Sequence, residues 1–92
     1  MYRIIDSRST GKTSRLLLLA KENNGVVVCL NPKKTQEKAY AYGLIGIDYV
    51  SYIDYINNPD EVGNKPIYID DLECFMACFT KNNLSGYTIS ED

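Results

Sequence analysis

The stretch YRIIDSRSTGKTSRLLLLAKENNG, residues 2–25, contains the pattern that decides the fold of this 92-residue chain. It begins with an apolar, β-like run at residues 2–6 and passes through a polar loop into a leucine-rich segment. Leucine and alanine favour a helix here, from about Lys12 to Asn23, and Asn24 and Gly25 are typical of a helix end. The stretch is therefore predicted to form a strand, a loop and a helix in direct succession.

The loop of this stretch carries Ser-Thr-Gly-Lys-Thr immediately before the predicted helix. Main-chain N–H groups at such a junction can point at a bound phosphate, and the positive end of the helix dipole assists them. The glycine allows close approach, the lysine reaches the β- and γ-phosphates, and the last threonine ligates magnesium through its hydroxyl. The residues predicted to contact the nucleotide are Arg8, Ser9, Thr10, Gly11, Lys12, Thr13 and Ser14, with Thr13 also a metal ligand.

Strand-like and helical patterns alternate along the rest of the chain. VVVCL at 26–30 is apolar throughout, as expected of a strand buried on both faces of a parallel sheet. Asn31 and Pro32 begin a helix that runs to about Tyr42, and Gly43 ends it. Ser51 with Asp54 resembles a capping box before another short helix. The predicted strands are 2–6, 26–30, 47–50, 67–70 and 87–90. This order predicts one α/β domain over 1–92, with three layers: a small, mostly parallel sheet of about five short strands and helices on both faces.

A second motif, PIYIDDLE at 66–73, combines an apolar strand with a group of acids at its end. Carboxylates at the end of a strand can bind a metal ion that in turn binds a phosphate. Asp70 is predicted to hold magnesium, usually through water, and Asp71 or Glu73 to orient or deprotonate an attacking water.

Four features, STGKT, VVVCL followed by a helix, IYIDDLE and the strand-like GYTIS, together make the sequence resemble the P-loop NTPases. More narrowly, it resembles the first RecA-like half of a helicase or a related ATPase. The resemblance implies a bound nucleoside triphosphate, ATP in preference to GTP, together with Mg²⁺. It also implies that IYIDDLE is the Walker B element and that Ser90, or Thr88, is a polar sensor beside the γ-phosphate.

Two departures from the family pattern bear on activity. Asp6 occupies the place of the first glycine of the loop, where a carboxylate would repel phosphates. Arg8 can offset this by pairing with Asp6 or with a phosphate; alternatively, Asp6 turns away and accepts hydrogen bonds from the loop. The chain also ends after GYTIS, without the strand that flanks the loop strand in the family. This predicts that 2–6 lies at a sheet edge, where a homodimer partner or another protein can add a strand.

Composition narrows the classes of function. Residues 1–40 hold eight Lys or Arg and three Asp or Glu, whereas 41–92 hold two and nine, for a net charge of -2. The asymmetry suits a phosphate site facing a cation site, with mixed surface charge as the alternative, and the net charge argues against a dedicated nucleic-acid binder. No apolar run is long enough to span a membrane. Three cysteines without a secretory signal favour reduced thiols in a cytoplasm, which is the host cytoplasm for a phage-encoded protein.

Three further patterns have structural interpretations. One face of a predicted helix after Asp70 is formed by Leu72, Phe75, Met76 and Phe79, which fall at i, i+3, i+4 and i+7. Tyrosines predicted to cover the core with their hydroxyls in water, or alternatively to form an interface, are Tyr40, Tyr42, Tyr49, Tyr52 and Tyr55. Thiols predicted to be packed, with a metal site as the alternative, are Cys29, Cys74 and Cys78.

The sequence thus predicts a Mg²⁺-dependent nucleotide-binding protein with weak hydrolysis or none, acting with a partner. The alternative is a non-enzymatic interaction or inhibitor protein of a phage or mobile element, such as an anti-CRISPR protein, that uses this fold as a scaffold. A kinase-like phosphoryl transferase is disfavoured because no arginine follows Asp70 to form a lid.

Overall fold

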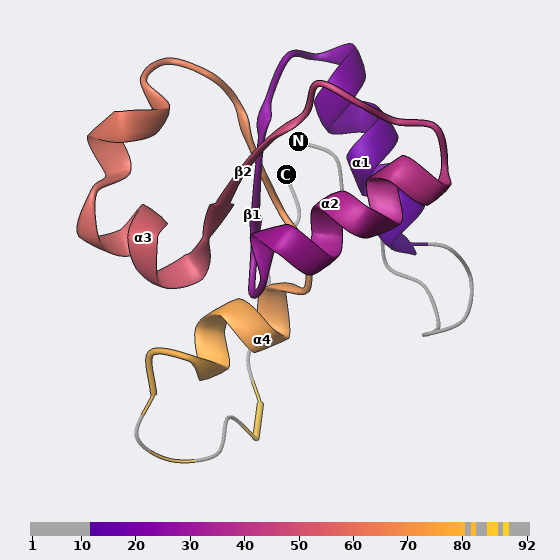
Figure 1. Cartoon of the computed structure of the whole chain (residues 1–92). Helices are drawn as coiled ribbons and strands as arrows, with labels where there is room; N and C mark the ends of the chain where they lie inside the picture. Colours follow the sequence, from indigo (N-terminus) through magenta and orange to yellow (C-terminus); the bar gives the residue numbers. More distant parts are fainter. Residues whose placement is uncertain (1–11, 81, 83–84, 87, 89–92) are drawn as a thin grey trace.

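The structure, a computed structural model of the chain, describes residues 12–80, 82, 85, 86 and 88 (Figure 1). Helices and strands alternate along these residues, as the sequence predicts. The elements are α1 Lys12–Glu22, β1 Val26–Cys29, α2 Pro32–Ala41, β2 Asp48–Ser51, α3 Tyr52–Asn57, the 3-10 turn η1 Pro59–Val62, β3 Ile67–Ile69 and α4 Leu72–Ala77. None of the helices in the described part of the chain has the length and apolarity needed to cross a membrane.

A three-stranded parallel sheet in the order β2-β1-β3 forms the centre of the described structure. Val26 of β1 pairs with Asp48 of β2 on one side and with Ile67 of β3 on the other. The α/β class and the parallel sheet are therefore confirmed, with fewer strands than the five predicted. The predicted strand at 2–6 lies outside the described residues, as does that at 87–90 except for Thr88, which is not in a strand.

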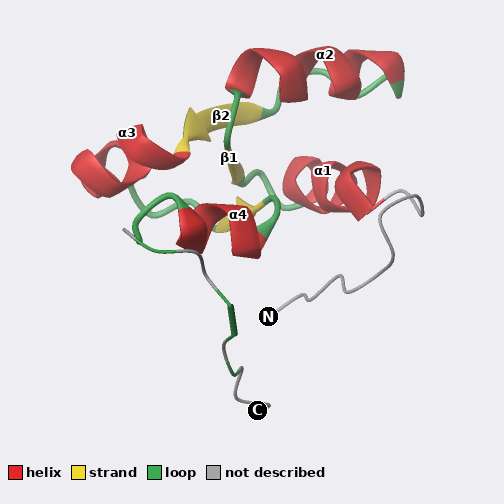
Figure 2. Cartoon of the chain, turned by 90° about the horizontal axis from the view of Figure 1, so that it is seen from below, coloured by secondary structure: helices red, strands yellow, loops and turns green. Residues whose placement is uncertain are grey.

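Helices cover both faces of this sheet. α1 and α2 contact each other and pack on one face, whereas α3 lies on the opposite face (Figure 2). The sheet order explains this arrangement. The chain moves from β1 to β2 through α2, and then returns past β1 to β3 through α3. Crossovers of one hand that run in opposite directions place their helices on opposite faces.

The core lies between the sheet and the α1–α2 layer. β1 is buried along its whole length, because alternate side chains of a strand point to opposite faces and helices cover both. Its residues Val27 and Cys29 are 0% and 1% exposed and pack with residues from the neighbouring helices and strands. The other buried members of this cluster are Leu17, Ala20, Ala39, Ile47 and Tyr68. Full burial of a valine side chain stabilises a fold by about 1.5–3 kcal/mol relative to exposure, so β1 is a principal source of stability.

Both long helices end in a Schellman arrangement, in which a residue with positive φ turns the chain back. At the end of α1, Asn24 has a φ of 52°, and the N–H of Gly25 donates to the carbonyl of Ala20 at 2.8 Å. At the end of α2, Gly43 has a φ of 76°, and the N–H of Leu44 donates to the carbonyl of Ala39 at 2.8 Å. Each turn aims the chain into the next segment, as the predicted stops at Asn24 and Gly43 require.

The helix predicted after Asp70 is present as α4, but its apolar side chains lie largely outside the core. Leu72 and Met76 of α4, and Phe79 just after it, are 43%, 47% and 45% exposed. Only Phe75 of this set is half-buried. The reason is that α4 lies at the carboxyl end of the strands (Figures 1 and 2), beyond the sheet faces that form the core.

Candidate functional site

Two residues 57 positions apart in the sequence meet at the carboxyl end of the sheet. The hydroxyl of Thr13 donates a hydrogen bond to Oδ1 of Asp70 at 3.2 Å, and both side chains are partly buried. These are the two residues predicted from separate motifs to hold a magnesium ion. The structure therefore brings the threonine of the GKT triplet and the first aspartate of the IYIDDLE motif to one place.

The local folding of each motif explains this meeting. Thr13 is the second residue of α1, which packs on β1 and β3 and begins near the carboxyl end of the strands (Figure 1). Asp70 directly follows β3, and its N–H donates to the carbonyl of Val28 at 2.9 Å, which extends the pairing of β3 with β1 by one step. The positive end of the α1 dipole favours negative charge here, both the Asp70 carboxylate and any phosphate.

The two acids predicted to act on water have different settings. Asp71 is exposed and has a φ of 61°, and its Oδ1 accepts a hydrogen bond from the N–H of Cys74 at 3.1 Å. It is therefore the N-cap of α4, a role that its sequence position alone did not suggest. Glu73 is exposed in the first turn of α4. Among the residues that the structure describes, neither Asp71 nor Glu73 forms a hydrogen bond with Thr13.

Several predicted site residues lie outside the described part of the chain. These are Arg8, Ser9, Thr10, Gly11 and Ser90. Asp6 is also outside it. Lys12 is the first residue of α1, Ser14 is half-buried on the same helix, and Thr88, the alternative sensor residue, is exposed. The described half of the predicted site thus consists of the start of α1 and the end of β3.

Tyr52 is the residue at this site that sequence reasoning missed. It was predicted to keep its hydroxyl in water, but the residue is 2% exposed and its hydroxyl donates to the main-chain carbonyl of Asp70 at 2.5 Å. Burial, followed by the neighbouring Cys74 and the two acids after β3, raises the pKa of Tyr52 well above its usual range. Its phenol is therefore a neutral donor at physiological pH. No sequence signal marks it, because the contact joins the ends of two strands that are not neighbours.

The thiols near the site are not arranged as a metal centre. Burial raises the pKa of Cys29, the neighbouring Thr35 side chain works against this shift, and the Asp70 carboxylate adds to it. Burial also raises the pKa of Cys74, whereas Cys78 is exposed. Within the described residues, no group of three or more His, Cys, Asp or Glu side chains is placed to hold a metal ion.

The donor set at Thr13 and Asp70 fits magnesium in its chemistry. A hydroxyl and a carboxylate are hard oxygen ligands, and Mg²⁺ in nucleotide sites usually takes only one or two protein ligands, with water and phosphates as the others. Thr13 and Asp70 would hold such an ion, and the ion would neutralise charge on the phosphates. Comparison of the chain with protein-family models, with curated proteins and with solved structures finds no match.

Proposed function

We propose that this protein binds a nucleoside triphosphate with Mg²⁺, ATP in preference to GTP, at the carboxyl end of its parallel sheet. The observation that carries the proposal is the hydrogen bond from Thr13 to Asp70 at 3.2 Å. It joins the residue after Gly-Lys to the residue after the strand IYI, as a shared magnesium ion requires. The place also agrees with a general rule for α/β sheets, whose ligands bind outside the carboxyl ends of the strands.

Weak hydrolysis, or none, is the turnover that we propose. A general base has to turn toward the attacking water. The Asp71 carboxylate is already engaged, because Oδ1 accepts the capping hydrogen bond from Cys74. Glu73 is the second residue of a short helix, and its side chain is exposed. Neither residue has the buried, converging setting that a strong base usually has.

The test is a calorimetric titration of the full chain with ATP and with GTP, each with and without Mg²⁺. The decisive variant is Asp70→Asn, because an asparagine Oδ1 still accepts from Thr13 but has no charge for the metal. We expect it to lose Mg²⁺-dependent affinity and to keep its fold. Asp60→Asn, an exposed acid in η1, is the matched control and should bind as the wild type does.

The results that would overturn the proposal are clear. A wild-type chain that takes up neither nucleotide at millimolar concentration excludes it. So does an Asp70→Asn variant that binds the Mg²⁺ complex as tightly as the wild type. Lys12→Ala adds a second probe, since the loop lysine is expected to contact phosphate and not the metal. It should weaken binding with and without Mg²⁺.

Exposed apolar side chains favour a second candidate function, a protein-interaction module on the same scaffold. α3 exposes Ile53 and Ile56 at 60% and 47%, and Leu72 and Met76 of α4, with Phe79 just after it, are also exposed. Exposed apolar groups that gather on neighbouring elements are typical of partner surfaces. The partner is a second copy or another protein, and the free side of β2 within the described sheet is a further candidate contact. For a phage-encoded chain this activity belongs in the host cytoplasm.

Analytical ultracentrifugation with and without nucleotide separates the two functions. A chain that dimerises equally in both conditions, and whose Lys12→Ala variant does so too, acts independently of nucleotide. If association instead requires Mg²⁺ and ATP, partner binding depends on occupation of the proposed nucleotide site.

A further inference from the structure

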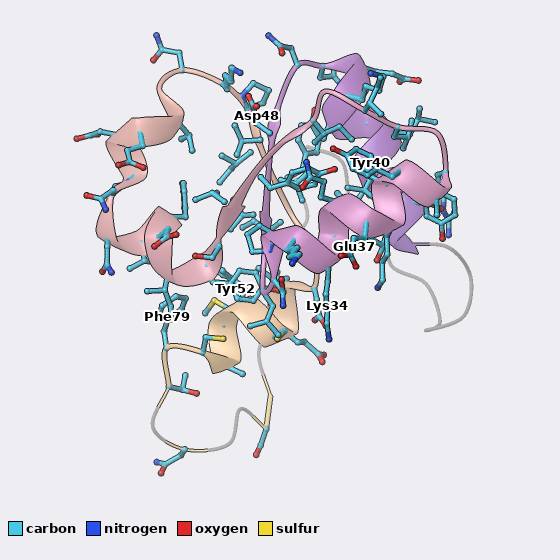
Figure 3. The ribbon with its side chains drawn as sticks, in the orientation of Figure 1. Lys34, Glu37, Tyr40, Asp48, Tyr52 and Phe79 are labelled. Atoms are coloured by element: carbon cyan, nitrogen blue, oxygen red, sulfur yellow. The ribbon has the colours of Figure 1, made fainter. Side chains whose placement is uncertain are left out.

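Tyr52 connects two strands that do not touch each other. It is the first residue of α3 and directly follows β2, yet its hydroxyl donates to the carbonyl of Asp70 at 2.5 Å, at the end of β3. The carbonyl of Asp71 is the second acceptor, at 3.3 Å. β1 lies between β2 and β3, so the tyrosine reaches across the carboxyl end of β1, close to the start of α4 (Figure 3).

This contact completes the restraint of the main chain at Asp70. The N–H of Asp70 donates to Val28 of β1, and its carbonyl accepts from Tyr52. The N–H and the carbonyl of Asp70, which flank its side chain along the backbone, are therefore both fixed by hydrogen bonds. The next residue, Asp71, has a φ of 61° and a ψ of 79°, a left-handed conformation that is unfavourable for a residue with a Cβ. A turn of this kind persists only where its surroundings hold it.

The aromatic ring of Tyr52 is itself held in place. Phe75 of α4 packs edge-on against it, with ring centroids 5.2 Å apart and an angle of 79° between the planes. Phe79 packs in the same manner on Phe75 at 5.3 Å. Edge-to-face ring pairs of this geometry are favourable beyond the apolar area that they bury. The hydroxyl is therefore presented to Asp70 by a fixed side chain.

We propose that Tyr52 is a positioning residue of the magnesium site: its hydroxyl fixes the main chain at Asp70 and Asp71, and thereby aims the Asp70 carboxylate at Thr13 and at the metal. The inference rests on the proposed nucleotide site and adds a residue from outside both of its motifs. Hydrogen-bonding partners that orient metal ligands usually affect metal affinity about 10–100-fold when they are removed.

The test is the variant Tyr52→Phe, which keeps the ring and its packing on Phe75 and removes only the hydroxyl. The measurement is the Mg²⁺ dissociation constant at a fixed ATP concentration, beside the ATP affinity in EDTA. We expect the Mg²⁺ constant to rise about tenfold and the metal-free ATP affinity to stay unchanged. Tyr55→Phe, one turn further along α3, is the matched control and should alter neither quantity.

A merely structural role would give a different pattern. If Tyr52→Phe only reduced the fraction of folded protein, the Mg²⁺ affinity and the metal-free ATP affinity would fall in parallel. The effect would then not be confined to magnesium. In the Asp70→Asn background, Tyr52→Phe should cause no further loss of Mg²⁺ affinity, because the group that it aims is already neutral. Phe75→Leu is the second variant for the case in which Tyr52→Phe does not fold. It loosens the ring, keeps the hydroxyl, and should raise the Mg²⁺ constant by a smaller factor.

The outcomes separate the two proposals. A wild type that binds Mg²⁺ and ATP, with an unchanged Mg²⁺ constant in Tyr52→Phe, overturns the positioning role and leaves the nucleotide site standing. The same holds if the metal-free and Mg²⁺-dependent affinities fall together. A wild type that binds no nucleotide overturns the proposed function and the effect of Tyr52 on metal affinity with it.

Discussion

Gly25 stands directly against the ring of Tyr68. A Cβ added at Gly25 would lie 2.5 Å from Cε1 of that ring and 2.8 Å from the carbonyl oxygen of Pro66. Gly25 joins α1 to β1, and Tyr68 is the buried central residue of β3. The close approach allows the end of α1 to enter the sheet beside β3, so this glycine is required by the packing.

The substitution Gly25→Ala is therefore expected to destabilise the protein. The added methyl group meets a buried ring and a backbone carbonyl, which have little room to move. Overpacking of this type costs about 1–3 kcal/mol. The measurement is the free energy of unfolding from urea denaturation. Gly86→Ala is the control, since a Cβ there meets no atom of the described residues within 4 Å. An equal loss of stability in the two variants would contradict the packing argument.

The start of α2 offers a second test of stability. The side chain of Asn31 accepts a hydrogen bond from the N–H of Lys34 at 3.2 Å, with Pro32 as the first helical residue. Removal of an N-cap side chain usually costs about 1 kcal/mol, and Asn31→Ala should lower the urea midpoint accordingly. Asn31→Asp, which keeps a capping oxygen, should stay close to the wild type. If both variants lose the same stability, the side chain does not act as a cap.

Alkaline pH should unfold the protein in a way that depends on Tyr52. Burial raises the pKa of Tyr52 above its ordinary value of 10.0, and that of Cys29 above 9.0. The folded chain therefore keeps protons that the unfolded chain releases, and stability falls as pH increases in that range. The contribution of Tyr52 and Cys29 to the free energy of unfolding is fully present below pH 9. It is lost as the pH rises through their raised pKa values in the folded state.

Urea midpoints between pH 8 and pH 11 check this expectation. Above pH 10 the midpoint of Tyr52→Phe should fall less steeply than that of the wild type, because one proton-linked group has been removed. Tyr42→Phe is the control, since Tyr42 is exposed, and its midpoint should follow the wild-type slope. Parallel slopes for Tyr52→Phe and the wild type would show that Tyr52 is not linked to folding.

The ion pair between Lys65 and Asp48 is expected to contribute little. Its Nζ and Oδ2 atoms are 2.6 Å apart, but the two side chains are 41% and 60% exposed. Exposed pairs contribute about 0.2–1 kcal/mol and are screened by salt. Asp48→Asn should therefore lower the free energy of unfolding only slightly at low salt, with no difference in 1 M NaCl. A large loss that persists in high salt would contradict this.

The fold could be predicted from the sequence where local signals dominate. VVVC, the Asn31–Pro32 helix start and the Asn24 and Gly43 stops are each determined by neighbouring residues, and all are confirmed. The hydrogen bond from the N–H of Asp54 to Ser51 likewise confirms the predicted cap of α3. The helical spacing after Asp70 correctly indicated α4, but spacing does not say what the apolar face covers.

The site was predictable only in part, for the same physical reason. Thr13 and Asp70 belong to motifs with a characteristic local context, so the expectation that they meet needed only the order of the elements. Tyr52 carries no such context. Its role depends on the sheet order β2-β1-β3, which places the start of α3 within reach of the end of β3. A contact between non-neighbouring strands cannot be read from spacing along the chain.

The wholly parallel pairing of β1 has a consequence for how this chain reaches its native state. Val26 finds its partners at Asp48 and Ile67, so neither neighbour of β1 is supplied by a tight turn. Each pairing has to close a loop that contains a helix, and the entropy of that closure is lost before the contacts form. Such distant pairings slow folding relative to helical bundles of the same size. The helices are therefore expected to form early and transiently, and the strand that is most buried at the end should be among the last to gain protection from hydrogen exchange during refolding.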